Sequence, residues 1–275
     1  MKNLESSTGK KRNHTVVVAW LLIMVSLFSV SRETMAEVPS SAGPQPGEAL
    51  TFKVSWSGIS SGKAVMRADK VGNERYSFSI HLRSSGLVET FYPVNDYLIA
   101  EGVWSQKGLN ALSFTKKQSE GGRKRLTEYA FQREKEAVVR RLNQGEPEYL
   151  ESVPSQVNDP VTALYLLRFQ QDLTPASTIN ISVMGSREWH HTPVEVGDVQ
   201  MLEVAAGQFQ AFPVSLDLGL FNKRKGNGRT TVWLSDDLRR LPILVKSKVS
   251  IGTMEFELTE ISEGTGSWLT EGMSN

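Results

Sequence analysis

An alternation of apolar and polar residues recurs along this chain and constrains its fold more than any other feature. In residues 50–56 every second residue is apolar, and residues 76–82 repeat the pattern after the turn sequence Gly72-Asn73. A period of two is that of a β-strand with one face buried and one face in water. Between these two segments, residues 64–68 alternate as a return strand after a glycine-containing turn. The first third of the chain therefore predicts an antiparallel sheet.

Strand-like segments continue to the C-terminal region. Their connections are mostly short, which favours antiparallel neighbours over the long crossovers that parallel strands need. The further segments are 96–104, 111–118, 126–133, 137–142, 178–184, 199–205, 209–218, 229–234, 241–249 and 254–259. About a dozen strands are expected in total.

One segment has a helical signature. Asp159 is a good N-cap and Pro160 a good first helical residue. The apolar residues that follow cover most of the helix circumference, so the helix is expected to be buried. We predict a mainly β fold, a single strongly curved antiparallel sheet or open barrel-like sheet with one buried helix on its concave side. The residues expected to line a ligand cavity there are Trp56, Leu164, Leu167 and Phe169.

The N-terminal region has the order of a secretory signal peptide. Lys10, Lys11 and Arg12 precede an apolar run at 16–30, and Thr34-Met35-Ala36 follows as a cleavage site. Such a run is shorter than the roughly 20 apolar residues that a spanning helix needs. We expect export to the periplasm and cleavage after Ala36, with an uncleaved inner-membrane anchor as the alternative. The expected organisation is a signal peptide at 1–36, a flexible lead-in at 37–48, a β-rich domain at 49–262 and a disordered tail at 263–275.

Composition narrows the functional classes. The chain has no cysteine, so it has neither a disulfide framework nor thiolate chemistry. Removal of residues 1–36 takes away five of the 31 basic and two of the 30 acidic residues, which leaves a net charge of about −2. A global positive field that would attract nucleic acid is therefore absent. No glycine-rich phosphate-binding loop stands between a strand and a helix, so no nucleotide cofactor is expected.

Three stretches resemble one known family. They are GEALTFKVSW at 47–56, DPVTALYLLR at 159–168 and WLSDD at 233–237, the last followed by Arg240 and Pro242. In this order they resemble the exported bacterial family called domain of unknown function 3108, over about residues 47–260. The resemblance implies an exported, β-rich envelope domain. It brings no catalytic residues that could be carried over to this chain.

Two short patterns suggest catalysis, and each has a simpler structural interpretation. Residues 58–62 match G-x-S-x-G, the pattern of a hydrolase serine, here Ser60. That chemistry needs a helix after the serine, whereas the following residues alternate as a strand. We therefore interpret the two glycines as turn residues of a β-hairpin. Asp236 and Asp237 are adjacent and would diverge in an extended chain, so we interpret them as structural turn residues.

No metal site is expected. His190 and His191 are also adjacent, so on a strand they would point to opposite faces and could not easily share one ion. Glu188 would lie on the same face as His190, but no third ligand is spaced to join them.

Clusters of cations could contact an anionic surface. Lys223, Arg224, Lys225 and Arg229 flank the hairpin-turn sequence 226–228, so they are expected at a loop tip. Such a tip could touch lipid headgroups or an acidic partner, or it could simply be solvated. Further clusters lie at 116–117, 123–125 and 140–141. The apolar segment 86–93 is expected either as a lip over a cavity or as a loop packed on the core.

We therefore expect a non-catalytic binding module of the periplasm that binds a lipid-like ligand or an envelope protein partner. No metal, cofactor or nucleic acid is expected, and proximity to a membrane is compatible with the cationic clusters. Two alternatives stay open: a structural or scaffolding protein of the envelope, and a hydrolase of an envelope polymer or lipid.

Overall fold

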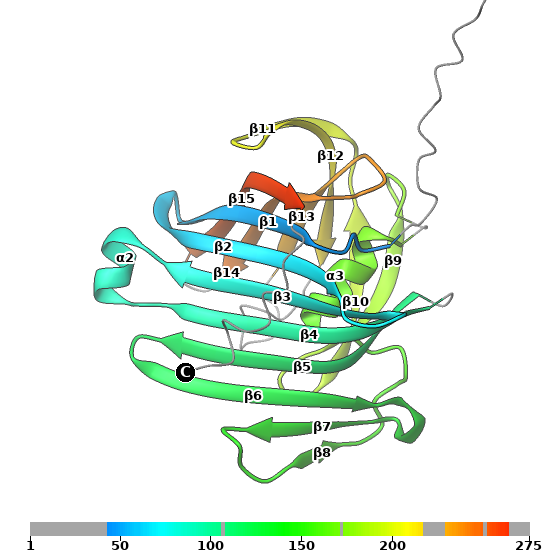
Figure 1. The fold of residues 1–275 in the computed structure, drawn as a ribbon. Helices are drawn as coiled ribbons and strands as arrows, with labels where there is room; N and C mark the ends of the chain where they lie inside the picture. Colours follow the sequence, from blue (N-terminus) through cyan, green and yellow to red (C-terminus); the bar gives the residue numbers. More distant parts are fainter. Residues whose placement is uncertain (1–42, 106–107, 171–172, 217–228, 250–251, 264–275) are drawn as a thin grey trace, which may run out of the picture. The chain divides into compact units, whose positions relative to one another are not determined.

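The structure is a computed structural model that describes residues 43–105, 108–170, 173–216, 229–249 and 252–263 (Figure 1). The chain divides into two units, Met1–Ser41 and Ala42–Asn275, and all described residues belong to the second. The expected signal peptide, most of the lead-in and residues 264–275 lie outside the described residues. Their predicted roles stay predictions.

Strands dominate the described part of the chain, as the alternation predicted. The helical elements there are α2 (Gly86–Phe91), α3 (Pro160–Arg168) and the short 3-10 helix η1 (Arg133–Lys135). The strands are β1 (Glu48–Trp56), β2 (Ile59–Lys70), β3 (Arg75–Ser84), β4 (Asn95–Ser105), β5 (Gly108–Glu120), β6 (Arg123–Gln132), β7 (Ala137–Leu142), β8 (Glu148–Leu150), β9 (Thr178–Met184), β10 (Trp189–Val196), β11 (Gln200–Val204), β12 (Gly207–Leu216), β13 (Thr230–Ser235), β14 (Pro242–Val249) and β15 (Gly252–Glu263).

These strands form one antiparallel sheet. The order is β8-β7-β6-β5-β4-β3-β2-β1-β15-β14-β13-β12-β10-β9, with β11 paired to β12. Most strands pair with their neighbour in sequence, but β1 lies between β2 and β15, so the first and last strands are side by side. The sheet is not closed, because β8 and β9 are its two ends. This confirms the predicted fold class.

Helix α3 lies against the concave side of the sheet. It contacts β3, β4 and β5 on one side and β9 on the other, so the sheet curves around it (Figure 1). The ring of Tyr165 stacks on that of Phe78 in β3, with centroids 4.0 Å apart. Almost all residues of α3 are buried, which confirms the predicted buried helix.

Local chemistry fixes the start of α3. The Asp159 carboxylate accepts hydrogen bonds from the backbone N–H groups of Val161 and Thr162 at 2.9 and 3.0 Å, and Pro160 follows at the first helical position. These bonds satisfy donors that have no partner within the helix. The helix ends at Arg168.

Asn158 joins the two halves of the sheet just before α3. Its backbone pairs with β9, because Asn158 N–H donates to Ser182 and Met184 N–H donates to the Asn158 carbonyl. Its side chain pairs with β5: Oδ1 accepts from Ala111 N–H at 2.7 Å, and Nδ2 donates to Leu109 O at 3.2 Å. One buried side chain thus connects strands that lie far apart in the strand order.

Several segments differ from the sequence interpretation, including the three-residue strand β8, which was not predicted. Strand β10 was not predicted, because Pro193 and the adjacent His190 and His191 interrupt its apolar pattern. The segment 86–93 was predicted as a loop packed on the core or as a lip. It contains helix α2, which has no buried residue, so packing on the core is excluded.

Candidate functional site on the concave face

The inner face of the sheet is defined here as the face that carries Phe78 and contacts α3. The pairing of residues between strands assigns further residues to this face, because residues directly opposite each other on adjacent strands share a face. Phe78 is opposite Ala68 and Ala100, and Ala68 is opposite Glu48, so all four residues lie on the inner face. All four are buried. This half of the inner face, around α3, is a packed core.

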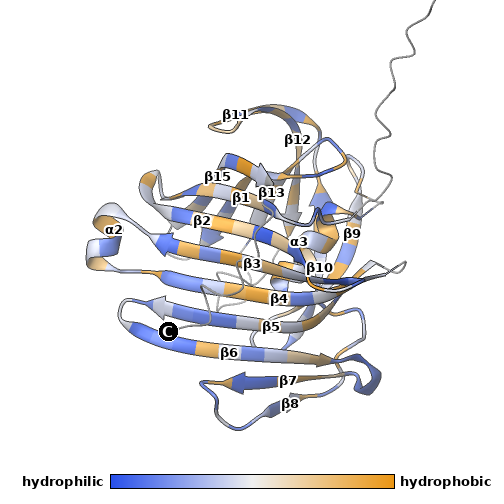
Figure 2. Cartoon of the chain, viewed as in Figure 1, coloured by the Kyte–Doolittle hydropathy of each residue, from blue (hydrophilic) through white to orange (hydrophobic). Residues whose placement is uncertain are grey.

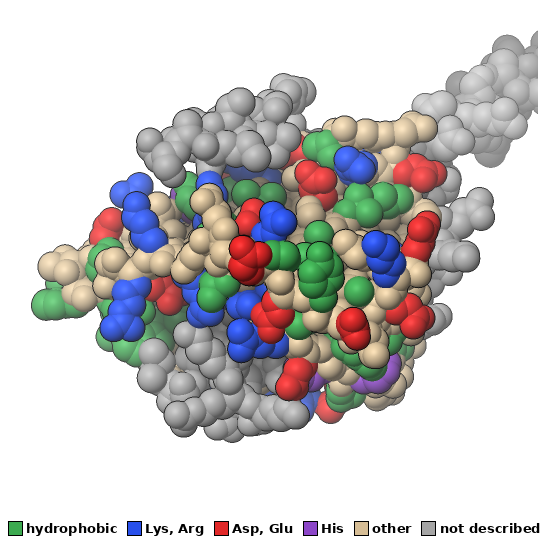
Figure 3. Space-filling view, turned by 90° about the horizontal axis from the view of Figure 1, so that it is seen from below, with side chains coloured by type: hydrophobic (Ala, Val, Ile, Leu, Met, Phe, Trp, Pro, Cys, Tyr) green, Lys and Arg blue, Asp and Glu red, His purple; other side chains and the backbone are tan. Residues whose placement is uncertain are grey.

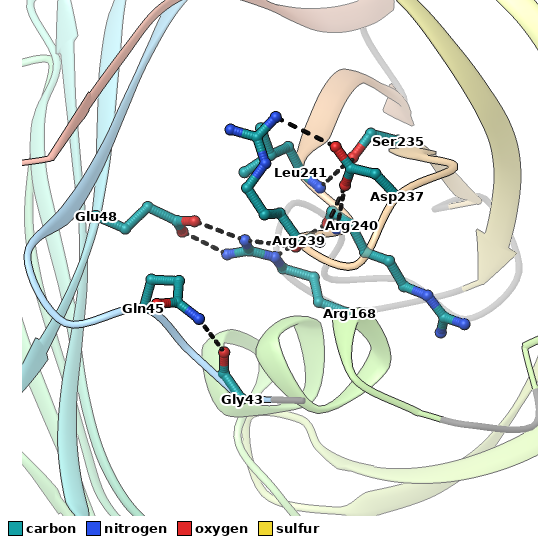
Figure 4. Close-up of polar contacts among 9 residues, drawn as sticks. All are labelled: Gly43, Gln45, Glu48, Arg168, Ser235, Asp237, Arg239, Arg240 and Leu241. Carbon is teal, nitrogen blue, oxygen red and sulfur yellow. Dashed lines mark hydrogen bonds and ion pairs between the residues drawn. The ribbon is translucent and has the colours of Figure 1, made fainter. Parts of the chain in front are cut away.

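A buried ion pair ties α3 to the start of β1 (Figure 4). The Arg168 guanidinium donates to both carboxylate oxygens of Glu48, at 2.6 and 2.8 Å. Its remaining N–H groups donate to the carbonyl oxygens of Arg239 and Arg240 in the β13–β14 connection, at 3.0 and 3.1 Å. Three segments distant in sequence therefore meet at one side chain.

The Arg168 charge is stabilised where it lies. Burial alone would lower the pKa of Arg168, but the hydrogen bonds and charge of Glu48 outweigh it and raise the pKa. The Arg168 guanidinium also lies 5.2 Å from the Tyr165 ring centroid and 5.3 Å from that of Phe169, within cation–π distance. Because four of its five N–H groups donate to protein oxygens and its side chain is only 1% exposed, Arg168 has a structural role.

Toward α2 the inner face of β3 and β4 is more open, whereas Met66 and Ala64 on the neighbouring strand β2 are buried there. Ile80, Leu82 and Leu98 lie there on adjacent strands, with Ile80 directly opposite Leu98. They are only half-buried, although they share a face with the fully buried Phe78 (Figure 2 shows the apolar positions of β3 and β4). Three contiguous apolar side chains that keep part of their surface in water form an apolar lining.

Polar side chains border this lining. Leu82 is opposite Asp96, and Leu98 is opposite Lys116 on β5. The Asp96 carboxylate accepts a hydrogen bond from Ser119 N–H at 2.9 Å. Burial raises the pKa of Asp96 to about 6; the Ser119 bond opposes this rise, and Glu120 adds to it. The apolar lining is therefore bordered by a cation and by a carboxyl whose pKa is raised to about 6.

The four residues predicted to line a cavity do not gather at one place. Leu164 and Leu167 are buried in the packed core around α3. Phe169 is half-buried and meets the Trp104 ring edge-on, with centroids 5.6 Å apart. Trp56 ends β1, eight residues from Glu48 and roughly 26 Å away at about 3.3 Å per residue. Their role in ligand binding stays a prediction.

The structure describes only part of the predicted cationic rim, and it describes both predicted turn residues. Lys223, Arg224 and Lys225 lie outside the described residues, and Arg229 is exposed and paired with Glu195. Asp237 accepts hydrogen bonds from the Ser235 hydroxyl and from the backbone N–H groups of Arg239 and Arg240. The neighbouring Asp236 is exposed in the same turn.

The G-x-S-x-G pattern lies in the β1–β2 hairpin, which confirms the hairpin interpretation of Ser60. Gly58 has a φ of 84°, a conformation that favours glycine. His190 and His191 are neighbours on β10, and both are exposed. In the part of the chain that the structure describes, no group of three His, Asp or Glu residues could hold a metal ion.

A surface depression of about 500 Å³ lies away from the inner-face lining. It is formed where β8 and the residues after it approach the β9–β10 hairpin, and Trp189 Nε1–H donates to Ser152 O at 3.0 Å there. Its lining residues are Tyr149, Leu150, Glu151, Ser152, Val153, Arg187, Glu188 and Trp189. The depression belongs to the contact between the two ends of the sheet.

Sequence reasoning missed the residues that organise the interior. Glu48 was assigned to the flexible lead-in, yet it is buried and pairs with Arg168. Glu48 begins the apolar strand β1 and Arg168 ends the apolar helix α3, and a charge beside an apolar segment was the available signal. Nothing in the sequence indicates that these two residues, 120 positions apart, are partners. Nor does the sequence indicate that Asn158 links β5 to β9.

Comparison with known proteins shows the family. The sequence profile described as "Protein of unknown function (DUF3108)" matches residues 51–259. The chain therefore belongs to this family, as the three stretches at 47–56, 159–168 and 233–237 suggested. No curated protein matches the chain.

Several solved structures match this chain at low sequence identity. A β-barrel-like protein of the DUF1849 family from Brucella abortus has 13% identity and a TM-score of 0.53, with 80% of this chain and 98% of that chain covered. This likeness supports the fold alone. A protein named as exported, with a YmcC-like fold, from Bacteroides fragilis has 10% identity and a TM-score of 0.30, covering 80% of this chain and 97% of that chain. A lipoprotein from Parabacteroides distasonis has 10% identity and a TM-score of 0.32, with the same coverage.

Among the described residues, no helix is both long and apolar enough to cross a bilayer.

Proposed function

We propose that this protein is a non-catalytic binding module of the bacterial periplasm that holds a lipid-like ligand against the open half of its inner face. The observation that carries the proposal is the contiguous, half-buried lining of Ile80, Leu82 and Leu98. Apolar side chains on the concave side of a curved sheet are normally covered by the core. A hydrocarbon chain would cover these three.

The polar border gives the ligand an orientation. Lys116 is opposite Leu98 at one side of the lining, and Asp96 is opposite Leu82. The hydrocarbon part of an amphiphile would contact the leucine and isoleucine side chains, and a phosphate or carboxylate headgroup would lie toward Lys116. Binding pockets generally combine many apolar contacts with a few placed polar groups.

The location rests on the N-terminal sequence. Lys10-Lys11-Arg12, the apolar run at 16–30 and the small residues before position 37 together support export. Fractionation of cells with N-terminal sequencing tests this part. A mature chain that begins near Glu37 in the periplasmic fraction is expected, whereas retention of Met1 in the membrane fraction would replace the soluble form by the anchored one.

A matched pair of variants tests the ligand. Leu98 and Ile99 are neighbours on β4, both half-buried, and face opposite sides of the sheet. The protein is purified from cells under mild conditions and extracted with organic solvent, and the extract is analysed by mass spectrometry. Wild type and Ile99→Gln should yield a lipid in near-stoichiometric amount, and Leu98→Gln should yield much less.

Equal lipid recovery from the Leu98→Gln and Ile99→Gln variants would show that the inner face is not the site. Absence of any lipid from the wild type would refute the carrier function itself. Circular dichroism of both variants checks that the sheet is intact.

A further inference from the structure

Helix α2 presents apolar side chains to solvent. It connects β3 to β4, and none of its residues is buried. Leu87 and Phe91 are 73% and 83% exposed and lie one turn apart, so they share one helix face. Tyr92 directly after the helix is also exposed, as is Ile59 at 59% at the start of β2, which α2 contacts.

The strand ends hold α2 firmly in this position. Ser85 N–H donates to Ser61 O at 2.9 Å, and Val94 N–H donates to the Ser84 hydroxyl at 2.8 Å. A six-residue helix is not stable alone in water, so these bonds fix it on the sheet. The fold therefore holds the apolar face of α2 in a fixed position in solvent.

Cations lie on one side of α2, at the tip of the β5–β6 hairpin. Arg123, Lys124 and Arg125 are consecutive there, and all three are exposed. The tip touches the α2 segment: Gly121 N–H donates to Pro93 O at 2.9 Å, and a side chain at Gly121 would lie 2.6 Å from the Tyr92 ring.

Cations also lie on the other side of α2, on the outer face of the sheet. Lys63 of β2 is directly opposite Lys53 of β1 and Arg83 of β3, and all three are exposed. Like charges directly opposite each other destabilise a sheet. Glu89 on α2 approaches Arg83 only at 3.6 Å, with both side chains largely in solvent. Lys53 also has Glu257 directly opposite it on β15, so the like-charge repulsion centres on Lys63, which has a cation on each side. An anionic partner would offset this repulsion.

We propose that the α2 tip, defined as Ile59, Leu87, Phe91 and Tyr92 with the flanking cations of 123–125 and the Lys53–Lys63–Arg83 row, docks the protein onto an anionic lipid bilayer. Figure 3 shows hydrophobic side chains at the tip where α2 lies, with lysine and arginine side chains nearby. Apolar and aromatic side chains would enter the headgroup region while the cations contact lipid phosphates.

The geometry favours a bilayer over a protein partner. The apolar side chains are at the end of a short connection that projects from the strand ends, and the cations flank them on two sides. An apolar apex with charged flanks suits shallow insertion into a headgroup layer, whose phosphates are available in every direction. The tip uses none of the inner-face residues, so this inference stands apart from the proposed ligand.

The test is co-sedimentation of the full purified chain with sucrose-loaded vesicles made of equal parts phosphatidylglycerol and phosphatidylcholine. Wild type should bind them, and should bind pure phosphatidylcholine vesicles much more weakly. Phe91→Ser should weaken binding by about tenfold or more, from the burial of a phenyl side chain. Lys124→Gln should weaken it about fivefold, because one cation near an anionic membrane surface contributes about that factor.

Two matched variants serve as controls. Leu238 is 69% exposed in the β13–β14 connection, and Lys135 is exposed in η1, both at the opposite end of the strands from α2. Leu238→Ser and Lys135→Gln should bind as wild type does. Equal losses in control and tip variants would overturn the proposal, as would equal binding of wild type to both vesicle types. So would a protein crosslinked in cells through Phe91 with no vesicle binding.

Discussion

The two halves of the inner face share the same strands and differ in what covers them. Around α3, Phe78, Leu50 and Tyr165 are fully buried, and the buried Arg168 and Glu48 form an ion pair. Toward α2, the same strands carry Ile80, Leu82 and Leu98 half-buried, next to a carboxyl whose pKa is raised to about 6. One half is built for stability, and the other keeps apolar surface available.

This difference in packing predicts which substitutions should destabilise the protein most. A side chain in the packed half has neighbours on every side, so its loss leaves a cavity or an unpaired charge. A side chain in the open half already faces water over part of its surface. The experiments below test this contrast, beginning with the largest expected effect.

Loss of the buried cation should have the largest effect. Arg168→Met leaves Glu48 buried without its partner, and breaking such a pair typically destabilises a protein by about 3–5 kcal/mol. Urea denaturation followed by tryptophan fluorescence measures the free energy of unfolding. The double variant Glu48→Gln/Arg168→Met should recover part of the loss. If Arg168→Met alone were neutral, Glu48 would have to be solvated, contrary to its burial.

Truncation of one leucine in each half compares the two directly. Leu167→Ala in the packed half should lower the free energy of unfolding by about 2–5 kcal/mol, because the cavity cannot collapse. Leu98→Ala in the open half should lower it by about 1 kcal/mol, since less apolar surface is withdrawn from water there. The same urea titration gives both values. Equal losses would mean that the two halves are packed alike.

The raised pKa of Asp96 predicts a pH dependence specific to the open half. Between about pH 4 and pH 6 the folded chain holds a proton that the unfolded chain has released, because the folded pKa is raised from 3.8 to about 6. Stability therefore falls as the pH rises through this window. The expected fall is roughly 1–3 kcal/mol, since one unit of pKa shift corresponds to about 1.4 kcal/mol.

Asp96→Asn should remove this part of the fall, measured as the difference between the wild-type and variant unfolding free energies at pH 4 and pH 7. Any slope that remains in the variant includes Asp159, whose pKa is also raised to about 6 by burial. If the difference between wild type and variant were independent of pH, Asp96 would be solvated.

The smallest effect should be a gain. Lys63→Glu replaces two like-charge contacts, with Lys53 and Arg83, by opposite-charge ones. Cross-strand pairs of opposite charge contribute about 0.2–1 kcal/mol each, so the variant should be about 0.5 kcal/mol more stable than wild type in the same assay. A loss of stability would remove the argument that the cationic row works against folding.

The sequence predicted the architecture because the signals for it are local. The alternation of 50–56 and 76–82 predicts strands, and Asp159-Pro160 predicts the start of a helix. Strand β10 was missed because Pro193 and two histidines hide its period. Such an interruption changes the pattern without changing the pairing, since Thr192 and Val194 still face inward as buried residues.

The division of the inner face could not be predicted. Phe78, Ile80 and Leu82 belong to one alternating pattern, and only the position of α3 decides which of them is covered. The pairing of Glu48 with Arg168 and the link through Asn158 depend on contacts between distant parts of the chain. The sequence showed that segment 86–93 is apolar, but it did not show that the segment contains a helix. That Lys53, Lys63 and Arg83 lie side by side near this helix follows only from the register of three strands.

The pairing of β1 with β15 has a consequence for how the chain is made. One edge of β1 can pair with β2 as soon as both have been synthesised, but its other edge must wait for residues 252–263. Until then an unpaired strand edge with apolar neighbours is available to other chains, which is an aggregation hazard. Contacts of such long sequence separation also slow folding. Assembly of the sheet is therefore completed only after nearly the whole chain has been synthesised, and a chain that stops before β15 would leave the middle of its sheet open.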